Sequence, residues 1–206
     1  MKLAVFGATG RVGSQVVKLA LEEGWEVVAL VRDEEKAKHM IKGASRIVGD
    51  VTNPADVKKT LIGCHMVFSG LSTDKTDTLS KAIPSMIKAM KKEEILRIVT
   101  IGTAGILNSR YEKGKYRFQT SESKRKKTFA AEEHVKVYEH FSRSNLDWTI
   151  VCPTYLPDGE EQGNIRYEID YLPIDGKKIT VDDTAKFTFE CLRNFRFSQK
   201  RVGICY

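Results

Sequence analysis

Residues 7–13 read Gly7-Ala8-Thr9-Gly10-Arg11-Val12-Gly13, and this stretch decides the fold. An apolar run ending at Phe6 precedes it and an amphipathic stretch over 14–23 follows it, a pattern that predicts a strand, a glycine turn and a helix. Phosphate oxygens reach the unpaired N–H groups of a helix start only where no Cβ stands in the way. We therefore expect Gly7 to make the turn, Gly10 to admit a diphosphate and Gly13 to let the helix pack closely.

Thr9, Arg11 and Val12 belong to the same turn and are expected to contact the cofactor with the three glycines. An ordinary tight turn would use glycines in the same way, so the surrounding pattern has to separate the two interpretations. A second apolar run at 26–31 completes a strand–helix–strand unit, which favours the phosphate-binding interpretation.

Apolar runs and amphipathic stretches continue to alternate along the chain, which predicts a Rossmann fold: one α/β domain with a doubly wound, mostly parallel sheet. Pro84 predicts a kink or a late helix start near Ile83. A polar stretch at 165–179 is hairpin-like. Further strands are expected at 46–48, 65–69, 97–101, 148–151 and 202–205, and helices at 33–42, after 52–56, and at 78–92, 128–144 and 181–194.

The composition fits one globular domain over residues 1–206, with 41% hydrophobic and 30% charged residues. No apolar run approaches the roughly 20 residues that span a bilayer, and the run at 3–6 is too short for a signal peptide. We expect a cytoplasmic protein without a membrane partner. The dispersed cysteines predict buried free thiols, with no spacing for a metal site or a disulfide framework: Cys64, Cys152, Cys191 and Cys205.

The chain carries a formal net charge of +7, from 34 basic and 27 acidic residues. The positive residues are dispersed except at Lys124-Arg125-Lys126-Lys127. Neither interleaved aromatic residues nor a recognition-helix pattern accompanies this cluster, so nucleic-acid binding is not favoured. A solvated basic loop is the favoured interpretation, and a rim that attracts an anionic substrate or cofactor is the second.

The Gly-x-x-Gly-x-x-Gly spacing resembles the short-chain dehydrogenase/reductase superfamily, and Gly-Ala-Thr-Gly resembles its atypical and extended members. In this fold, an acid after the second strand selects NAD through the ribose 2′-hydroxyl, whereas arginine selects the 2′-phosphate of NADP. Arg32 stands at that position, and its planar guanidinium suits phosphate oxygens. The adjacent Asp33 could bind the ribose hydroxyl of NAD, and Arg32 could instead be a solvent-facing charge at a helix start. We favour NADP over NAD.

The same resemblance implies that an aspartate after the third strand contacts adenine. Asp50 and Val51 occupy that place, although a plain turn aspartate is the alternative. Gly70 and Leu71 follow the fourth strand at its carboxyl end, where ligands of open α/β sheets bind, so this loop is expected to pass the cofactor ribose.

Superfamily members hold the substrate carbonyl with a serine or threonine after the fifth strand, a role that Thr103 fits, and protonate it with a Tyr-x-x-x-Lys pair. The string from Tyr111 to Lys115 has Gly114 inside a polar, loop-like segment, so we interpret it as chance. Counted back from the strand at 148–151, the tyrosine would fall near Ala130 and the lysine near His134, and neither side chain is present.

The chain thus lacks the tyrosine–lysine pair of the wider superfamily. In this respect, and in its residues at 30–33, 49–51 and 132–134, it resembles the NADPH-dependent flavin reductase/biliverdin reductase B group, and more loosely the NmrA-like proteins. The resemblance implies roles in catalysis and cofactor binding for Thr103 and His134, and places Tyr138 where that group can carry a second histidine. A surface or packed helix histidine is the alternative for His134.

Pro153, Thr154 and Tyr155 open on the cofactor edge and are expected to contact nicotinamide and an aromatic substrate, within a small substrate-side segment at 153–180. A flavin or linear tetrapyrrole spreads the charge of an added hydride, so the missing tyrosine argues against simple carbonyl reduction. The leading hypothesis is an NADPH-dependent reductase of a planar conjugated acceptor, monomeric or weakly dimeric. A nicotinamide-binding sensor of NmrA type is the alternative, and a sugar-nucleotide epimerase or dehydratase is disfavoured.

Overall fold

A single sheet organises the computed structural model, which describes residues 1–73, 75–123 and 127–206. Seven strands run parallel and β7 runs antiparallel to β8, in the order β3-β2-β1-β4-β5-β6-β8-β7. This confirms the doubly wound, mostly parallel Rossmann arrangement, with its switch in strand order between β1 and β4. The strands are β1 (Lys2–Phe6), β2 (Glu26–Val31), β3 (Ser45–Val48), β4 (Met66–Ser69), β5 (Arg97–Ile101), β6 (Asp147–Pro153), β7 (Arg166–Ile169) and β8 (Lys200–Cys205).

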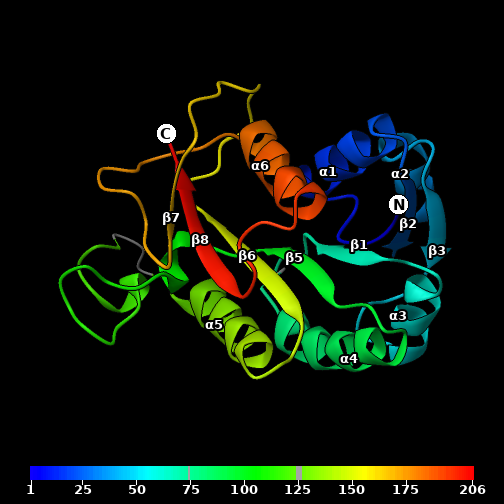
Figure 1. Ribbon diagram of the computed structural model, residues 1–206, viewed down its shortest axis with the longest axis horizontal. Coiled ribbons are helices and arrows are strands. Elements are labelled where there is room, and N and C mark those ends of the chain that lie inside the picture. The colour runs from blue at the N-terminus through cyan, green and yellow to red at the C-terminus, as the bar shows by residue number, and fades with distance from the viewer. Residues whose placement is uncertain (74, 124–126) are drawn as a thin grey trace.

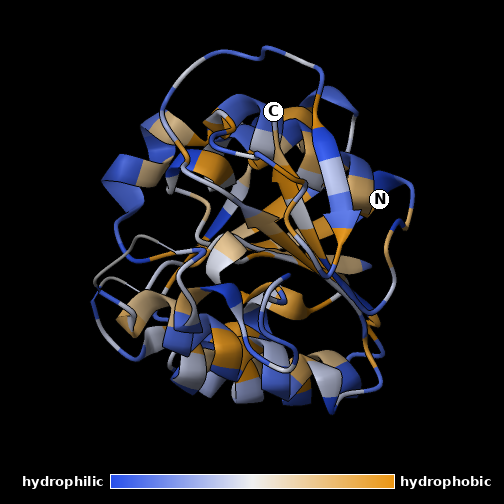
Figure 2. Ribbon diagram, turned by 90° about the vertical axis from the view of Figure 1, so that its left-hand side faces the viewer, coloured by the Kyte–Doolittle hydropathy of each residue, from blue (hydrophilic) through white to orange (hydrophobic). Residues whose placement is uncertain are grey.

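Helices cover both faces of the sheet (Figure 1). One face carries α1 packed against α6, together with α2, and the other carries α3, α4 and α5. Two separate apolar cores result, one on each side of the sheet, and Figure 2 shows apolar strands between helices with polar outer surfaces. The helices are α1 (Arg11–Glu22), α2 (Glu34–Met40), α3 (Pro54–Leu61), α4 (Thr78–Lys92), α5 (Phe129–Ser142) and α6 (Val181–Arg193), with 3-10 turns η1 (Ala104–Ile106) and η2 (Arg117–Gln119).

Capping residues fix where several helices begin. Asn53 accepts the Ala55 N–H before Pro54 opens α3, which confirms the helix start predicted there. Thr180 caps α6 through the Asp183 N–H, and acids fill the first turn of that helix. These local signals place the ends of helices whose lengths are then set by packing on the sheet.

Helix α4 contains Pro84. It begins at Thr78, so the late start near Ile83 is wrong and the helix predicted at 78–92 is confirmed, while the alternative, a kink at Pro84, stays a prediction. Proline removes one helical hydrogen bond, but the apolar stripe of this helix is fully packed on the sheet and α5. Packing therefore outweighs the local cost of the proline. The stripe consists of Leu79, Ala82, Ile83, Met86 and Met90.

The polar stretch at 165–179 is not a hairpin of its own. Its one strand, β7, pairs with β8 at the end of the sheet, and Lys178 forms an isolated parallel bridge with Tyr155. The predicted hairpin is therefore wrong in its partner, because the pairing residues come from distant parts of the chain.

All four cysteines are buried and unpaired, as predicted. Of the predicted basic loop at 124–127, only Lys127 lies within the described residues. Across the described parts of the chain, no helix is long and apolar enough to cross a membrane, and no cluster of three His, Cys, Asp or Glu side chains could hold a metal.

Two largely irregular segments stand at the carboxyl ends of β5 and β6. Residues 102–123, with η1 and η2, follow β5, and residues 154–180, with β7, follow β6. The two segments lie side by side at one end of the molecule, green and yellow to orange in Figure 1. In an open α/β sheet this is the edge where ligands bind. The segments thus form walls of any site there.

Candidate functional site: two pockets along the carboxyl edge

Two neighbouring pockets open on the carboxyl edge of the sheet. The first, of about 520 Å³, lies where β1, β2 and β4 end, and the second, of about 390 Å³, lies where β5 and β6 end. We call them the turn pocket and the outer pocket. The turn pocket contains these predicted residues: Gly7, Thr9, Gly10, Arg32, Asp50, Val51, Gly70 and Leu71. The outer pocket contains Thr103, Pro153, Thr154 and Tyr155.

The glycine turn leaves no room for side chains at two positions. Gly7 has φ +81°, and a Cβ there would lie 2.6 Å from the Gly70 carbonyl carbon. A Cβ on Gly13 would lie 2.1 Å from the Gly7 carbonyl oxygen, so α1 rests directly on the turn. Both distances are shorter than any real carbon contact, which explains why the turn needs glycine at each end.

Helix α1 begins without any competing acceptor of its own. Its N-cap is Gly10, which has no side chain, and its first turn contains no acidic residue. The first N–H groups of a helix have no intrahelical partner and carry the positive end of its dipole. The start of α1 therefore suits an anionic group lying against Gly10 in the turn pocket.

Arg11 and Val12 do not line either pocket. Arg11 Nη1 donates to the Leu156 carbonyl and to Asp158 Oδ1, each at 2.9 Å, and so connects α1 with the segment after β6. Val12 is buried in the core. Only the backbone N–H groups of these residues remain as predicted cofactor contacts.

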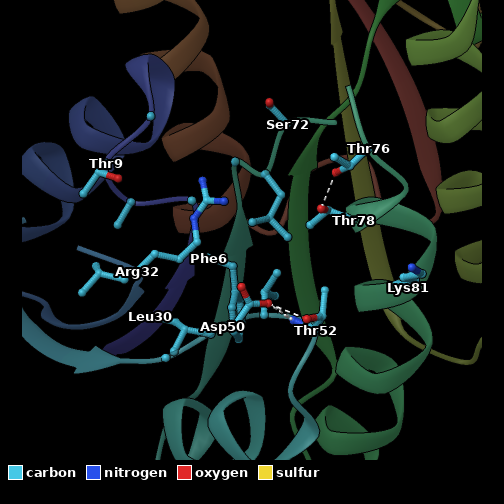
Figure 3. Close-up of a pocket in the computed structure, with 18 of the residues that line it drawn as sticks. Phe6, Thr9, Leu30, Arg32, Asp50, Thr52, Ser72, Thr76, Thr78 and Lys81 are labelled. Atoms are coloured by element: carbon cyan, nitrogen blue, oxygen red, sulfur yellow. Dashed lines mark hydrogen bonds between the residues drawn. The ribbon is translucent and has the colours of Figure 1, made fainter. Parts of the chain in front are cut away.

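Two residues at the end of β2, Arg32 and Asp33, bear on the choice between NADP and NAD. Asp33 Oδ1 accepts the Lys36 N–H at 2.9 Å and caps α2, and Asp33 does not line the turn pocket. Arg32 and Lys36 do line it, and Figure 3 shows the Arg32 guanidinium directed into the pocket. Sequence reasoning missed Lys36, which lies in the first turn of α2, four residues after Arg32.

Asp50 both shapes a turn and faces the turn pocket. Its Oδ1 accepts the Thr52 N–H at 2.7 Å and the Thr52 hydroxyl at 2.5 Å (Figure 3). These two bonds outweigh burial and, with the charge of Arg32, lower the pKa of Asp50. Asp50 Oδ1 therefore stabilises the turn, as the plain turn interpretation predicts. The adenine contact stays a prediction for the other carboxylate oxygen, Oδ2.

The far wall of the turn pocket comes from the start of α4, which sequence reasoning did not assign. Thr76 and Thr78 share a 2.7 Å hydrogen bond between their hydroxyls (Figure 3), and Lys81 Nζ lies 3.0 Å from Asp77 Oδ2. Thr76 and Thr78 lie across the pocket from Arg32 (Figure 3).

Thr103 and Thr154 bring two hydroxyls to the outer pocket. Thr103 Oγ1 accepts the Gly105 N–H at 3.4 Å and caps η1. Thr154 Oγ1 is buried and has no hydrogen-bond partner among the described residues. A buried hydroxyl without a partner costs free energy, so Thr154 is suited to a polar ligand atom that would pair with it.

His134 is not brought to the outer pocket or the turn pocket. It is partly buried on α5, and desolvation lowers its pKa to about 4 despite the nearby charge of Glu133. Ala130, where the superfamily's tyrosine was expected, does line the outer pocket. The ring centroid of Tyr138 lies 4.2 Å from Arg201 Cζ, and the ring packs edge-on against Trp148. Tyr138 therefore has a structural role.

The string from Tyr111 to Lys115 lies in a turn, as predicted. Tyr111 is 82% exposed, and Lys115 pairs with Glu112 at 2.6 Å. Neither side chain lines either pocket. This pair therefore offers no substitute for the missing tyrosine and lysine.

The sequence matches a known protein family over most of its length. The sequence model of the NAD(P)H-binding family matches residues 7–195. The chain belongs to this NAD(P)H-binding family. The resemblance to nicotinamide-dependent reductases is thereby confirmed at the level of the family, and the turn pocket provides the glycine turn and the uncapped helix start that such a cofactor requires.

Similar proteins differ in what they are named for. A protein from Streptococcus pneumoniae proposed to be an NADH-flavin reductase is 26% identical, with TM-score 0.83, over 100% of this chain and 99% of that one. ChuY, an anaerobillin reductase of Escherichia coli O157:H7, shares the fold at 21% identity and TM-score 0.84, over 100% of this chain and 97% of that one. The photosystem II assembly factor Ycf39 of Cyanophora paradoxa is 34% identical over 106 residues, 47% of this chain and 33% of that protein. The alignment thus spans about a third of that curated relative's length.

Proposed function

We propose that this protein is an NADPH-dependent reductase that transfers hydride to a planar, conjugated acceptor such as a flavin or a linear tetrapyrrole. The observation that carries the proposal is the pairing of a dinucleotide-type glycine turn with an adjoining pocket whose position 130 is alanine. The turn pocket takes the cofactor's adenosine and diphosphate, and the outer pocket receives the acceptor.

NADP is favoured over NAD by what surrounds the end of β2. The acid that would bind a ribose 2′-hydroxyl, Asp33, caps α2 through its Oδ1. Arg32 and Lys36 line the pocket instead and supply two cations for a 2′-phosphate. A dinucleotide that carries this extra phosphate therefore gains contacts that NAD lacks.

The residues of the outer pocket bind and orient the acceptor. Thr103 and Thr154 present hydroxyls, while Tyr155 and Phe118 provide aromatic surface. The nicotinamide supplies the hydride when it is bound, and the protein supplies position and electrostatics. With alanine at position 130 and no pocket-lining histidine, the proposal requires an acceptor that delocalises the added negative charge and takes its proton from solvent or a hydroxyl.

Similarity to the pneumococcal protein supports a flavin as one acceptor, because the two chains match over nearly their full lengths. The match to Ycf39 supports a second candidate function, a nicotinamide-binding sensor or assembly factor without turnover. The absence of the superfamily's tyrosine at position 130 is compatible with both.

Oxidation of NADPH, followed at about 340 nm, tests the proposal directly. Purified protein is mixed with NADPH and, in separate reactions, FMN, riboflavin, biliverdin or a simple aldehyde. We expect multiple turnovers with at least one planar acceptor and none above background with the aldehyde. Saturable NADPH binding without oxidation in any reaction would refute the reductase and support the sensor. Turnover of the aldehyde alone would refute the assignment of a planar acceptor.

A further inference from the structure

Charged side chains surround the outer pocket unevenly. Among the described residues that line it, three are cationic and one is a carboxylate: Arg117, Lys127, Lys177 and Glu122. A pocket for a neutral acceptor has no use for a surplus of positive charge. The surplus positive charge therefore affects which acceptors the outer pocket binds.

Arg117 and Glu122 compensate each other. Arg117 Nε lies 3.5 Å from Glu122 Oε1, and the Glu122 side chain is 8% exposed. Burial favours the neutral form of Glu122, but hydrogen bonds from Ser109 and the Arg110 N–H, with the charge of Arg117, hold its pKa below the usual value. Glu122 is thus an anion that neutralises Arg117, and the surplus resides in the lysines.

Lys127 and Lys177 reach the pocket from different segments. Both are exposed, and neither has a carboxylate partner within the described parts of the chain. The backbone around Lys177 is fixed, because the Gly176 N–H donates to the Pro173 carbonyl at 3.1 Å and the Ile179 N–H donates to the Tyr155 carbonyl at 3.0 Å. These bonds hold Lys177 beside Tyr155, within the wall of the pocket.

Polar groups that suit an anion continue inward from these lysines. Thr128 is the N-cap of α5 and makes no side-chain cap hydrogen bond among the described residues, and the first turn of that helix, which also carries Glu132, lines the pocket through Ala130 and Ala131. Thr154 adds a buried hydroxyl that has no partner in the described parts of the chain. Two lysines, the start of a helix and this hydroxyl thus line one pocket of about 390 Å³.

We infer that the outer pocket selects acceptors that carry an anionic arm, a phosphate or a carboxylate, and that Lys127 and Lys177 are the residues that recognise it. The inference rests on the proposed function for the identity of the ring and adds the chemistry of its substituent. The conjugated ring lies against Phe118 and Tyr155, and the arm extends toward the two lysines.

Two pairs of compounds separate the arm from the ring. FMN and riboflavin differ by a phosphate, and biliverdin and its dimethyl ester differ by the charge of two carboxylates. Because exposed charge pairs contribute modestly, we expect the anionic member of at least one pair to have a kcat/KM roughly fivefold to tenfold higher at low salt. The preference should shrink in high salt, since added ions screen exposed charges.

The double variant Lys127→Gln, Lys177→Gln tests the assignment to these residues. It should reduce the ratio of kcat/KM for the anionic to the neutral member to near one. Lys178→Gln is the matched control, because it removes the same charge from the adjacent position, which does not line the pocket. The control should keep the wild-type ratio.

Failure of this inference is distinguishable from failure of the proposed function. The inference is overturned if the anionic and neutral members of both pairs have equal kcat/KM, or if the preference for the anionic member persists in the double variant. Either result leaves the proposed reductase function standing. If no compound is reduced, equilibrium binding of the same four compounds to the NADP⁺ complex decides. Tighter binding of an anionic member that is lost in the double variant supports the inference, and equal or absent binding overturns it.

Discussion

Arg32 and Asp33 show how neighbouring residues divide two roles that the sequence alone leaves open. Residue type favoured Arg32 as a phosphate ligand and kept its neighbour Asp33 open as a ligand of the ribose hydroxyl. The structure adds that the Asp33 carboxylate caps α2, while Arg32 and Lys36 face the turn pocket. Asp33 caps the helix because α2 begins directly after it, and the position of that helix start is known only from the folded backbone.

Replacing Arg32 with alanine should change the choice of cofactor. Charge-assisted bonds to phosphate are strong, so we expect the dissociation constant for NADPH to rise about 10- to 100-fold and that for NADH to change less than about threefold. Lys38→Ala is the control, since it removes a charge from the adjoining helix α2, at a position outside the pocket. Calorimetry with both nucleotides measures the effect, and equal losses for the two would remove Arg32 from this role.

His134 should make the fold sensitive to acid. Its pKa is lowered to about 4, so between pH about 6.5 and 4 the unfolded chain binds a proton that the folded chain does not. The free energy of unfolding therefore falls as the pH falls through this window. Between pH 7.5 and 5, the free energy of unfolding of His134→Gln should fall by about 2 kcal/mol less than that of the wild type, as measured by urea unfolding.

The exposed His39 on α2 provides the control for this comparison. His39→Gln should show the same loss of stability with acid as the wild type. If His134→Gln also follows the wild-type curve, burial of His134 does not control its protonation.

At the scale of elements, periodicity predicted almost every strand and helix, since apolar runs and capping residues are local signals. Where it failed, distant contacts decided the outcome: α4 accommodates Pro84 because its apolar stripe is packed, and β7 pairs with β8. Phe118 and Lys177 of the outer pocket could not be found from the sequence. They lie in irregular segments that meet only after the sheet has formed.

Gly13 allows a test in which two effects have opposite signs. Inside a helix, glycine to alanine stabilises by about 1 kcal/mol through propensity alone. Here a Cβ would lie 2.1 Å from the Gly7 carbonyl oxygen, so α1 would have to move off the turn. Gly13→Ala should therefore destabilise the protein by several kcal/mol, about 3 or more, and abolish nucleotide binding.

Gly24→Ala is the matched control in thermal and urea unfolding. Gly24, unlike Gly13, has a positive φ of +77°, but nothing lies within 4 Å of its Cβ position, so the cost should be about 1 kcal/mol, with binding retained. A Gly13→Ala protein that is as stable as the wild type would show that α1 does not depend on this close approach.

At the scale of the whole molecule, one edge of the sheet carries both the turn pocket and the outer pocket. The strand order leaves a crevice between β1 and β4, the glycine turn enters it, and the segments after β5 and β6 extend it into a second pocket. A parallel sheet makes this arrangement predictable in outline, because all of its carboxyl ends face the same way. The shape and charge of the second pocket follow from tertiary contacts and needed the structure.

The most direct measurement is a calorimetric titration of the protein with NADP⁺ and NAD⁺, because the account depends on a diphosphate binding at the start of α1. We predict one saturable site, with a dissociation constant for NADP⁺ of about 1–100 µM and weaker binding of NAD⁺. No heat of binding from either nucleotide at millimolar concentration, by a protein shown to be folded, would contradict it.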